Sequence, residues 1–146
     1  MMEPLILKHF TTKDALRLLH LLLETSPQAA LEVYHCGRPG VVYIPENLAP
    51  DKADWLRRKR NSVLYFGLST QALFEKQKGE ESLLASKYGR ELKDYTWTPG
   101  GVPIQVVGVG LLGSVTVTGL KPEEDHALAL GLLRTLQEEQ NHDDNL

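Results

Sequence analysis

The chain has 146 residues, and its 16 lysines and arginines against 19 aspartates and glutamates give a formal net charge of −3 at pH 7. A general nucleic-acid binder usually carries a strongly basic surface, so this balance argues against that class of partner. The length is that of one domain, residues 1–146, and is sufficient to bury a hydrophobic core.

The cysteine count and the apolar runs indicate the compartment. Cys36 is the only cysteine, which excludes an internal disulfide and favours a reducing environment. The chain start lacks the basic and long apolar segments of a secretory signal peptide. The most apolar run, residues 16–23, is interrupted by Arg17 and His20 and is too short to cross a membrane. We therefore expect a cytoplasmic protein with no membrane partner.

The first half of the chain predicts two helices and three strands. Thr11 or Thr12 precedes a periodic run of leucines and is a helix-capping signal. Two apolar runs on either side of residues 37–40 indicate a hairpin, because that segment contains glycine and proline. The expected elements are a short edge strand at 5–10, a helix at 13–24, hairpin strands at 31–36 and 41–44, and a long helix at 52–66.

The second half predicts a short helix, a second hairpin and a final helix. Val115 and Val117 alternate with serine and threonine, which is the period-two pattern of a strand with one apolar face. The glycines of residues 108–113 are expected to form the turn. The expected elements are a helix at 82–88, an aromatic loop at 95–99, strands at 102–107 and 114–118, a helix from 122 to about 139, and a fraying polar tail at 141–146.

Residues 108–113 also match the glycine pattern of a dinucleotide-binding fingerprint. That fingerprint functions only where its third glycine opens a helix whose N-terminus holds the pyrophosphate. Here the third glycine, Gly113, opens a β-branched run, so we do not expect a nucleotide site. Hairpins separated by helices instead predict an α+β fold, with an antiparallel sheet of about five strands flanked by helices.

The least usual local composition is the basic run Arg57-Arg58-Lys59-Arg60 in the long predicted helix. Successive helical residues step by about 100°, so four in a row sweep most of the helix circumference and cannot all face water. The apolar stripe of this helix, formed by Ala53, Leu56 and Val63, places Arg60 within it, whereas Lys59 falls on a flanking face. A buried cation needs a partner, which is a carboxylate of the same subunit, a carboxylate of a neighbouring subunit, or an anionic ligand.

A second unusual segment opens the last predicted helix, where three acidic residues follow Pro122. Acidic residues in the first turn favour the helix dipole, which is a sufficient account of Glu123 and Glu124. Asp125 and His126 fall at the edge of the buried stripe. His126 is either a packing residue, a general acid or base, or a metal ligand. We predict that Arg60 pairs with Asp125 first and Glu124 second.

No metal site is expected, since the other histidines and Cys36 show no metal-ligand spacing.

The motifs quoted above resemble a small family within the haem-degrading-domain superfamily, which includes GlcG-like, HbpS-like and PduO C-terminal-like domains. The resemblance is carried by Trp55 to Asn61, Gly100-Gly101, the glycines at 108, 110 and 113, and Glu124-Asp125-His126. It implies a profilin-like antiparallel sheet flanked by helices, homo-oligomers, and a haem, corrinoid or other ligand.

Three functions follow as hypotheses. The first is an oligomeric small-ligand-binding module whose cofactor or ligand is unknown, with haem, a corrinoid or a small anion as candidates. The second is a non-catalytic interaction protein in which the same residues form the subunit interface, and the third is an enzyme that uses His126 as acid or base. A haem would need an axial ligand, for which His126 and Tyr95 are available. The candidate ligand-binding or interface residues are Trp55, Arg57, Arg58, Arg60, Asn61, Gly100, Gly101, Asp125 and His126.

Overall fold

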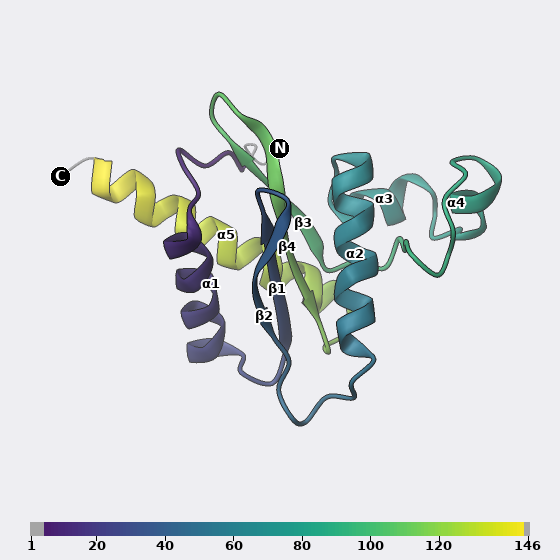
Figure 1. The fold of residues 1–146 in the computed structure, drawn as a ribbon, viewed down its shortest axis with the longest axis horizontal. Coiled ribbons are helices and arrows are strands. Elements are labelled where there is room, and N and C mark those ends of the chain that lie inside the picture. Colours follow the sequence, from purple (N-terminus) through teal and green to yellow (C-terminus); the bar gives the residue numbers. More distant parts are fainter. Residues whose placement is uncertain (1–4, 145–146) are drawn as a thin grey trace.

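A computed structural model describes residues 5–144, which form one sheet with helices on both of its faces (Figure 1). The four strands pair antiparallel in the order β2-β1-β4-β3. In chain order the elements are α1 (Thr12–Thr25), β1 (Ala30–His35), β2 (Arg38–Tyr43), α2 (Lys52–Phe66), α3 (Thr70–Lys76), α4 (Ser82–Ser86), β3 (Gly101–Val106), β4 (Gly110–Thr118) and α5 (Pro122–Asp144). The predicted α+β class is confirmed.

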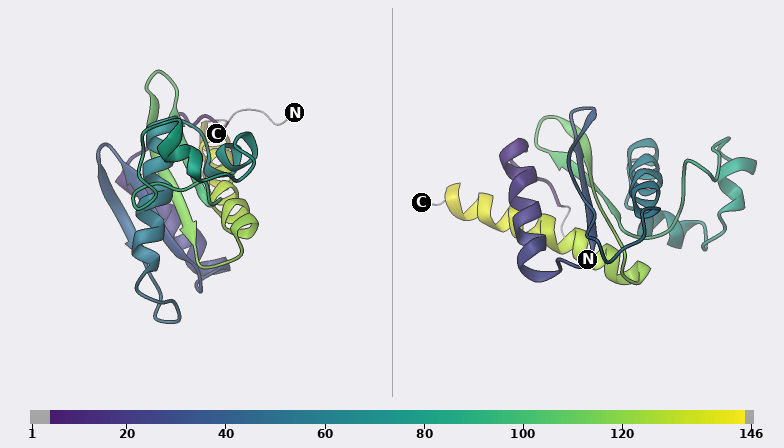
Figure 2. Two further views of the ribbon diagram at one scale, coloured as in Figure 1. Left: turned by 90° about the vertical axis from the view of Figure 1, so that its right-hand side faces the viewer. Right: turned by 60° about the horizontal axis from the view of Figure 1, so that its bottom comes forward.

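The two faces of the sheet differ in polarity because its strands alternate. Leu31 and Val33 of β1, with Val115 and Val117 of β4, point into the main core, which α1 and α5 close. The opposite face carries Glu32, Ser114, Thr116 and Thr118, and α2 covers it. Figure 2 shows α2 on one side of the sheet and α1 and α5 on the other. The helix that carries the basic run therefore packs on a polar sheet face.

The helix predictions for the first half are confirmed, whereas the strand count is wrong. Helix α1 begins after Thr11, whose backbone N–H donates to Asp14 Oδ2 at 2.8 Å, and α2 spans the predicted residues. The predicted edge strand at 5–10 is reduced to one parallel bridge between Leu7 and Val106. Within the described part of the chain the sheet therefore has four strands in place of the expected five.

Both hairpins turn at different residues from those predicted. The β1–β2 chain reverses at Cys36 and Gly37, which both have positive φ. The β3–β4 chain reverses at residues 107–109, and Gly110 to Gly113 lie in β4. Gly113 is needed for a close approach, since a Cβ there would overlap the Tyr34 carbonyl oxygen. The third glycine of the fingerprint thus belongs to a strand, as expected.

Helix α5 extends beyond the predicted end near residue 139. Residues 141–144 are helical and residues 145–146 lie outside the described range, so the fraying of the tail stays a prediction. The buried Gln140 holds this end of the helix to the N-terminal segment. Its side chain accepts a hydrogen bond from Lys8 N at 3.1 Å and donates one to His9 O at 3.0 Å.

Residues 67–99 form an arm that projects from the sheet and carries α3 and α4 (Figure 1). Gly67, with φ of 72°, ends α2 and starts the arm. A second, smaller cluster of Leu73, Leu84 and Trp97 packs with three flanking aromatic residues and gives the arm its own core. Among residues 5–144, no helix is long and apolar enough to span a membrane.

Candidate functional site

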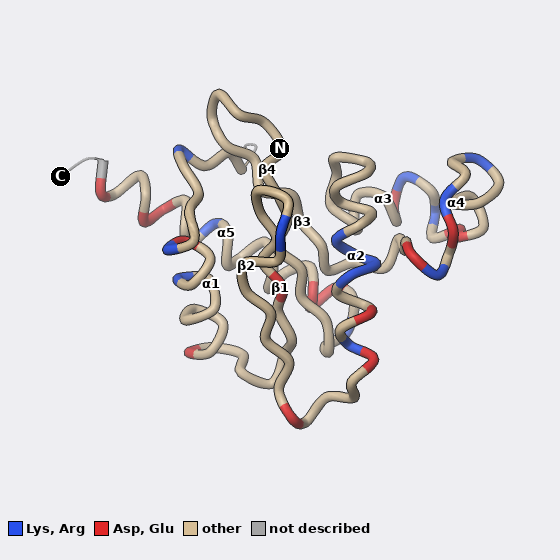
Figure 3. Tube along the Cα trace, in the orientation of Figure 1, with Lys and Arg blue, Asp and Glu red and all other residues tan. Residues whose placement is uncertain are grey.

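The four residues of the basic run of α2 have three different surroundings. Arg57 and Arg58 face the projecting arm, where charges are dense (Figure 3). Arg57 Nη1 donates to Asp94 Oδ1 and its Nη2 to Asp54 Oδ1, each at 2.9 Å. The Arg58 guanidinium lies 4.4 Å from the centre of the Trp55 ring, and its Nη2 donates to a backbone oxygen of the arm at 3.2 Å. These two arginines stabilise the arm against α2.

Lys59 is the cation that the fold buries, with a side chain only 1% exposed. Its Nζ donates to Asp125 Oδ2 at 3.2 Å and to Val117 O at 2.9 Å. Asp125, whose side chain is 3% exposed, also accepts from Leu120 N at 3.0 Å through Oδ1. Burial lowers the pKa of Lys59 and raises that of Asp125, and each charge partly offsets the shift of the other.

Arg60 does not meet Asp125, so the predicted pair is wrong in its cation. Arg60 Nε donates to Glu32 Oε1 at 2.9 Å, and the guanidinium stacks 4.6 Å from the centre of the Tyr34 ring. Burial raises the pKa of Glu32, which Arg60 partly opposes. The predicted alternative partner, Glu124, accepts a hydrogen bond from Lys121 N at 3.2 Å and so serves the start of α5.

The error lies in which face of α2 points towards the sheet. The predicted stripe included Ala53, but Ala53 is exposed, and the buried face of α2 runs through Leu56, Lys59, Ser62 and Val63. The helix is therefore rotated about its axis relative to the prediction, and Lys59 faces the sheet.

The paired glycines Gly100 and Gly101 lie under this face of α2. At Gly100, where φ is 136°, a Cβ would come within 2.7 Å of Lys59 Nζ and would overlap the Val117 carbonyl oxygen. At Gly101 a Cβ would lie 2.8 Å from Val63 Cγ2. Of the predicted site residues, Gly100 and Asp125 therefore do meet, and they do so around Lys59, which was not among the predicted site residues.

Asn61 completes the outer face of α2, where its Nδ2 donates to the Asp94 backbone oxygen at 2.9 Å. With Arg57 and Arg58, it contacts the arm and not the Lys59–Asp125 pair. The structure thus separates the nine predicted site residues into four groups. Trp55, Arg57, Arg58 and Asn61 lie on the side of α2 that contacts the arm, Gly100, Gly101 and Asp125 surround Lys59, Arg60 pairs with Glu32, and His126 lies apart from all of these.

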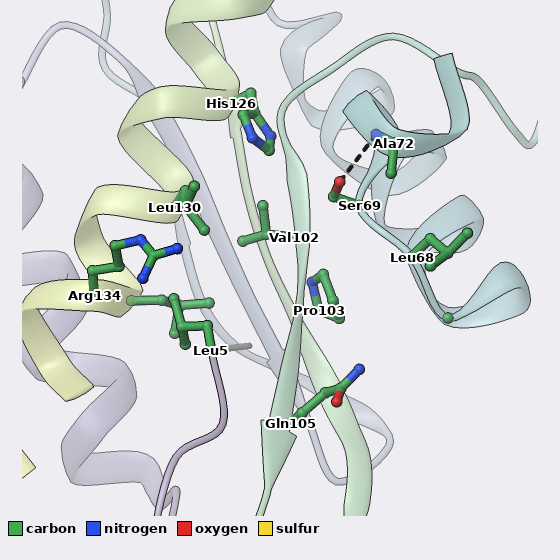
Figure 4. A pocket seen from close by; sticks show the side chains of 12 residues that line it. Leu5, Leu68, Ser69, Ala72, Val102, Pro103, Gln105, His126, Leu130 and Arg134 are labelled. Carbon is green, nitrogen blue, oxygen red and sulfur yellow. Dashed lines mark hydrogen bonds between the residues drawn. The ribbon is translucent and has the colours of Figure 1, made fainter. Parts of the chain in front are cut away.

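His126 faces a different part of the molecule, although it follows Asp125 directly. It lines a cavity of about 360 Å³ between α5, β3 and the start of α3. Figure 4 shows His126, Leu130 and Arg134 on one face of α5, opposite Val102, Pro103 and Gln105 of β3. The remaining lining residues are Leu5, Gly67, Leu68, Ser69, Ala72 and Leu133. Most of these side chains are apolar, and the polar groups are few.

The imidazole of His126 is not hydrogen-bonded within residues 5–144. Its Nδ1 is buried and has no partner there, and burial lowers the pKa of the ring below its ordinary value of 6.5. The charge of Glu75 opposes that shift. A neutral imidazole is the form that binds a metal or accepts a proton. Over the same residues, no group of three His, Cys, Asp or Glu side chains is arranged to hold a metal ion.

Sequence reasoning identified His126 but missed the rest of this cavity. The missed residues include Gln105 and Arg134, which bring an amide and a guanidinium to an otherwise apolar wall. The sequence did contain a signal for Arg134. It lies eight residues after His126, with Leu130 midway, and residues spaced by four share a helix face. Gln105 and Ser69 come from other elements, so no sequence spacing links them to His126.

Comparison with known proteins agrees with the fold. Residues 10–133 match the family model described as haem degrading protein HbpS-like. A UPF0303 protein from Paraburkholderia phymatum is 35% identical over 135 residues, which cover 90% of this chain and 82% of the relative.

Two solved structures extend the comparison. The crystal structure of the Ybr137w protein matches with a TM-score of 0.76 and 26% identity, over 91% of this chain and 83% of that one. A complex of PduOC with heme matches with a TM-score of 0.68 over 86% and 93% of the two chains, and at 15% identity it supports the fold alone. The chain therefore belongs to the HbpS-like family, among its UPF0303 proteins.

Proposed function

We propose that this protein is a small-ligand-binding module whose ligand occupies the His126 cavity. The observation that carries the proposal is the buried Nδ1 of His126, which has no partner within residues 5–144, inside a largely apolar cavity. A buried polar atom without a partner costs roughly 1–3 kcal/mol. A ligand that bonds the imidazole removes that cost and gains the apolar contacts of the walls.

A tetrapyrrole is the ligand class that fits these residues best. Haem is held by an axial side chain, commonly histidine, and a neutral His126 supplies one. The leucines of the cavity suit the apolar ring, and Arg134 and Gln105 suit its carboxylate groups. When bound, haem would supply a redox-active iron centre. The similarity in fold to PduOC, solved with heme, supports this class, and a corrinoid is the alternative within it.

Tyr95, the other candidate axial ligand, has a different role. Tyr95 lies on the arm, where its ring packs 5.9 Å from that of Tyr65 of α2, and it does not line the His126 cavity. The enzymatic hypothesis has less support, because no described side chain hydrogen-bonds His126 and positions it for proton transfer. We therefore assign His126 a binding role.

The test is a titration of the purified protein with hemin, followed by absorbance in the Soret region. We expect a saturable change in the Soret band for the wild type and its loss or displacement in His126→Ala. His20→Ala, at an exposed position of α1, is the matched control and should behave as wild type. A titration with cobinamide distinguishes the corrinoid alternative.

Two results would contradict this function. If hemin and cobinamide both fail to saturate the wild type, the tetrapyrrole class is wrong. If His126→Ala binds hemin with an unchanged spectrum, the cavity is not the site.

Self-association is supported by a feature outside the predicted interface residues, the tip of the β3–β4 hairpin. Val107 and Val109 are 64% and 61% exposed, and Ile6 and Leu111 are exposed beside them. No charged residue lies on this hairpin, as Figure 3 shows. An uncharged, apolar and exposed tip favours self-association, so we propose that the ligand-binding module is a homo-oligomer.

A further inference from the structure

A second cavity, of about 270 Å³, lies on the other side of the start of α5 from His126. It lies between the first half of α2, the end of β4 and the first turn of α5, with Thr98 of the arm at its edge. Its lining combines two lysines, two threonines, one carboxylate and three apolar side chains. The lining residues are Lys52, Trp55, Lys59, Thr98, Thr118, Gly119, Leu120, Pro122 and Asp125.

Lys59 gives this cavity an unsatisfied donor. An ammonium group carries three N–H donors. Two of them are used, by Val117 O at 2.9 Å and Asp125 Oδ2 at 3.2 Å, and the third has no acceptor among residues 5–144. The side chain is 1% exposed, and Lys59 is among the residues that line the cavity, so a further acceptor can approach the ammonium only from the cavity side. A carboxylate oxygen of a bound ligand is an acceptor of that kind.

The charges around the cavity favour an anion as that group. Lys52 lies two helical turns before Lys59 on α2, and its positive charge acts on Lys59. Asp125 is the only carboxylate in the lining. The nearest carboxylate to Lys52 is that of the exposed Asp51, at 3.9 Å from Nζ to Oδ1. Two ammonium groups thus face one carboxylate inside the cavity.

We propose that this cavity binds a short-chain organic carboxylate. The carboxylate accepts from Lys59 and Lys52, with the hydroxyls of Thr98 and Thr118 available as further donors, and the carbon chain lies against Trp55 and Leu120. The apolar part of the lining is the reason to prefer an organic acid to inorganic phosphate, which presents oxygen on every side. This site is separate from the His126 cavity and does not depend on a tetrapyrrole ligand.

The test uses tryptophan fluorescence, because Trp55 lines the cavity whereas the other tryptophan, Trp97, is fully buried in the arm. Sodium butanoate, acetate and phosphate are titrated separately at constant ionic strength set with sodium chloride. We expect a saturable change with butanoate, a weaker affinity for acetate, and no saturation with phosphate. The signal should be absent in Trp55→Phe.

Lys52→Gln is the decisive variant, since Lys52 is partly exposed and its loss should leave the fold intact. It should weaken butanoate binding about tenfold or more, the effect of losing one hydrogen bond to a charged group. Lys121→Gln is the matched control, because it removes the same charge from an exposed neighbour outside the lining, and it should bind as wild type. Lys59→Met, checked for folding by circular dichroism, should abolish binding.

The proposal is overturned if butanoate does not saturate, if phosphate binds as well as butanoate, or if Lys52→Gln and Lys121→Gln behave alike. His126→Ala should retain butanoate binding, and Lys52→Gln should retain the hemin response. Saturation by butanoate without any hemin response would support this site while contradicting the tetrapyrrole proposal.

Discussion

Lys59 Nζ lies 3.2 Å from Asp125 Oδ2, and the two side chains are 1% and 3% exposed. This pair joins the middle of α2 to the first turn of α5 across the end of β4. Desolvating two charges is costly, so the pair is maintained by its geometry and by the hydrogen bonds from Leu120 N and to Val117 O.

Removing one partner of this pair should destabilise the fold strongly. Lys59→Met and Asp125→Asn should each cost about 3 kcal/mol or more in free energy of unfolding, because the remaining charge is left buried and unpaired. The double variant should cost clearly less than the sum of the two. Urea unfolding measures each value. In a second double-mutant cycle, the costs of Arg60→Gln and Asp125→Asn should simply add, because these two side chains do not meet. The observed pairing would be contradicted if the Arg60 and Asp125 changes were coupled while the Lys59 and Asp125 changes were additive.

Gly100 should not tolerate a side chain. Gly100→Ala places a methyl group against Lys59 Nζ and the Val117 carbonyl oxygen at a φ of 136°, so we expect a loss of roughly 2 kcal/mol or more. Gly131→Ala is the matched control, because a Cβ at that position of α5 meets nothing and alanine favours helix. Thermal unfolding should show a lower Tm for Gly100→Ala and an equal or higher Tm for Gly131→Ala. The reverse order would show that Gly100 is not under steric constraint.

His126 should contribute a pH dependence to stability. Its folded-state pKa lies below the ordinary 6.5, so between these two values the unfolded chain binds a proton that the folded chain does not. The free energy of unfolding should therefore fall as pH falls below about 6.5, and rise as pH rises through the same range. His126→Gln should lose this component, whereas His20→Gln should keep it. Urea unfolding at several pH values between 5 and 7 measures the difference, and identical slopes for wild type and His126→Gln would contradict the burial of a neutral imidazole.

Self-association should depend on the apolar hairpin tip. We expect light scattering to give a mass well above the 16.3 kDa of one chain. Replacing Val107 and Val109 with lysine introduces charge where the hairpin has none, and should shift the mass towards that of the monomer. A wild-type monomer at micromolar concentration would contradict the oligomer proposal. An oligomer unaffected by the two lysines would place the interface elsewhere.

Local sequence signals predicted most of the fold. Helix α2 was predicted from residue 52 to about residue 66 because Pro50-Asp51 is a helix start signal. The structure shows that it ends at Gly67, which is in the left-handed conformation. The errors occur where tertiary contacts determine at which residue an element begins or ends. The β4 strand begins at Gly110 because its glycines pair with neighbouring strands, and α5 continues to Asp144 because Gln140 is anchored by the N-terminal segment.

The site was predicted less well for two geometric reasons. The face of α2 that points inward is set by Gly100 and Gly101, which leave space for Lys59, and such contacts between distant segments are not visible in a helical pattern. Asp125 and His126 were grouped because they are adjacent in sequence. Adjacent helical residues point about 100° apart, so one reaches the buried lysine and the other reaches the cavity.

The most direct test of the ligand-binding function is to map a bound tetrapyrrole by NMR. Zinc protoporphyrin is diamagnetic, so amide resonances of the ¹⁵N-labelled protein can be followed during its titration. We predict that the largest shifts will cluster at residues around the His126 cavity, namely Leu68, Ser69, Ala72, Gln105, His126 and Leu130. Shifts confined to the hairpin tip or to residues 77–99 of the arm, or no saturable shifts at all, would contradict the account.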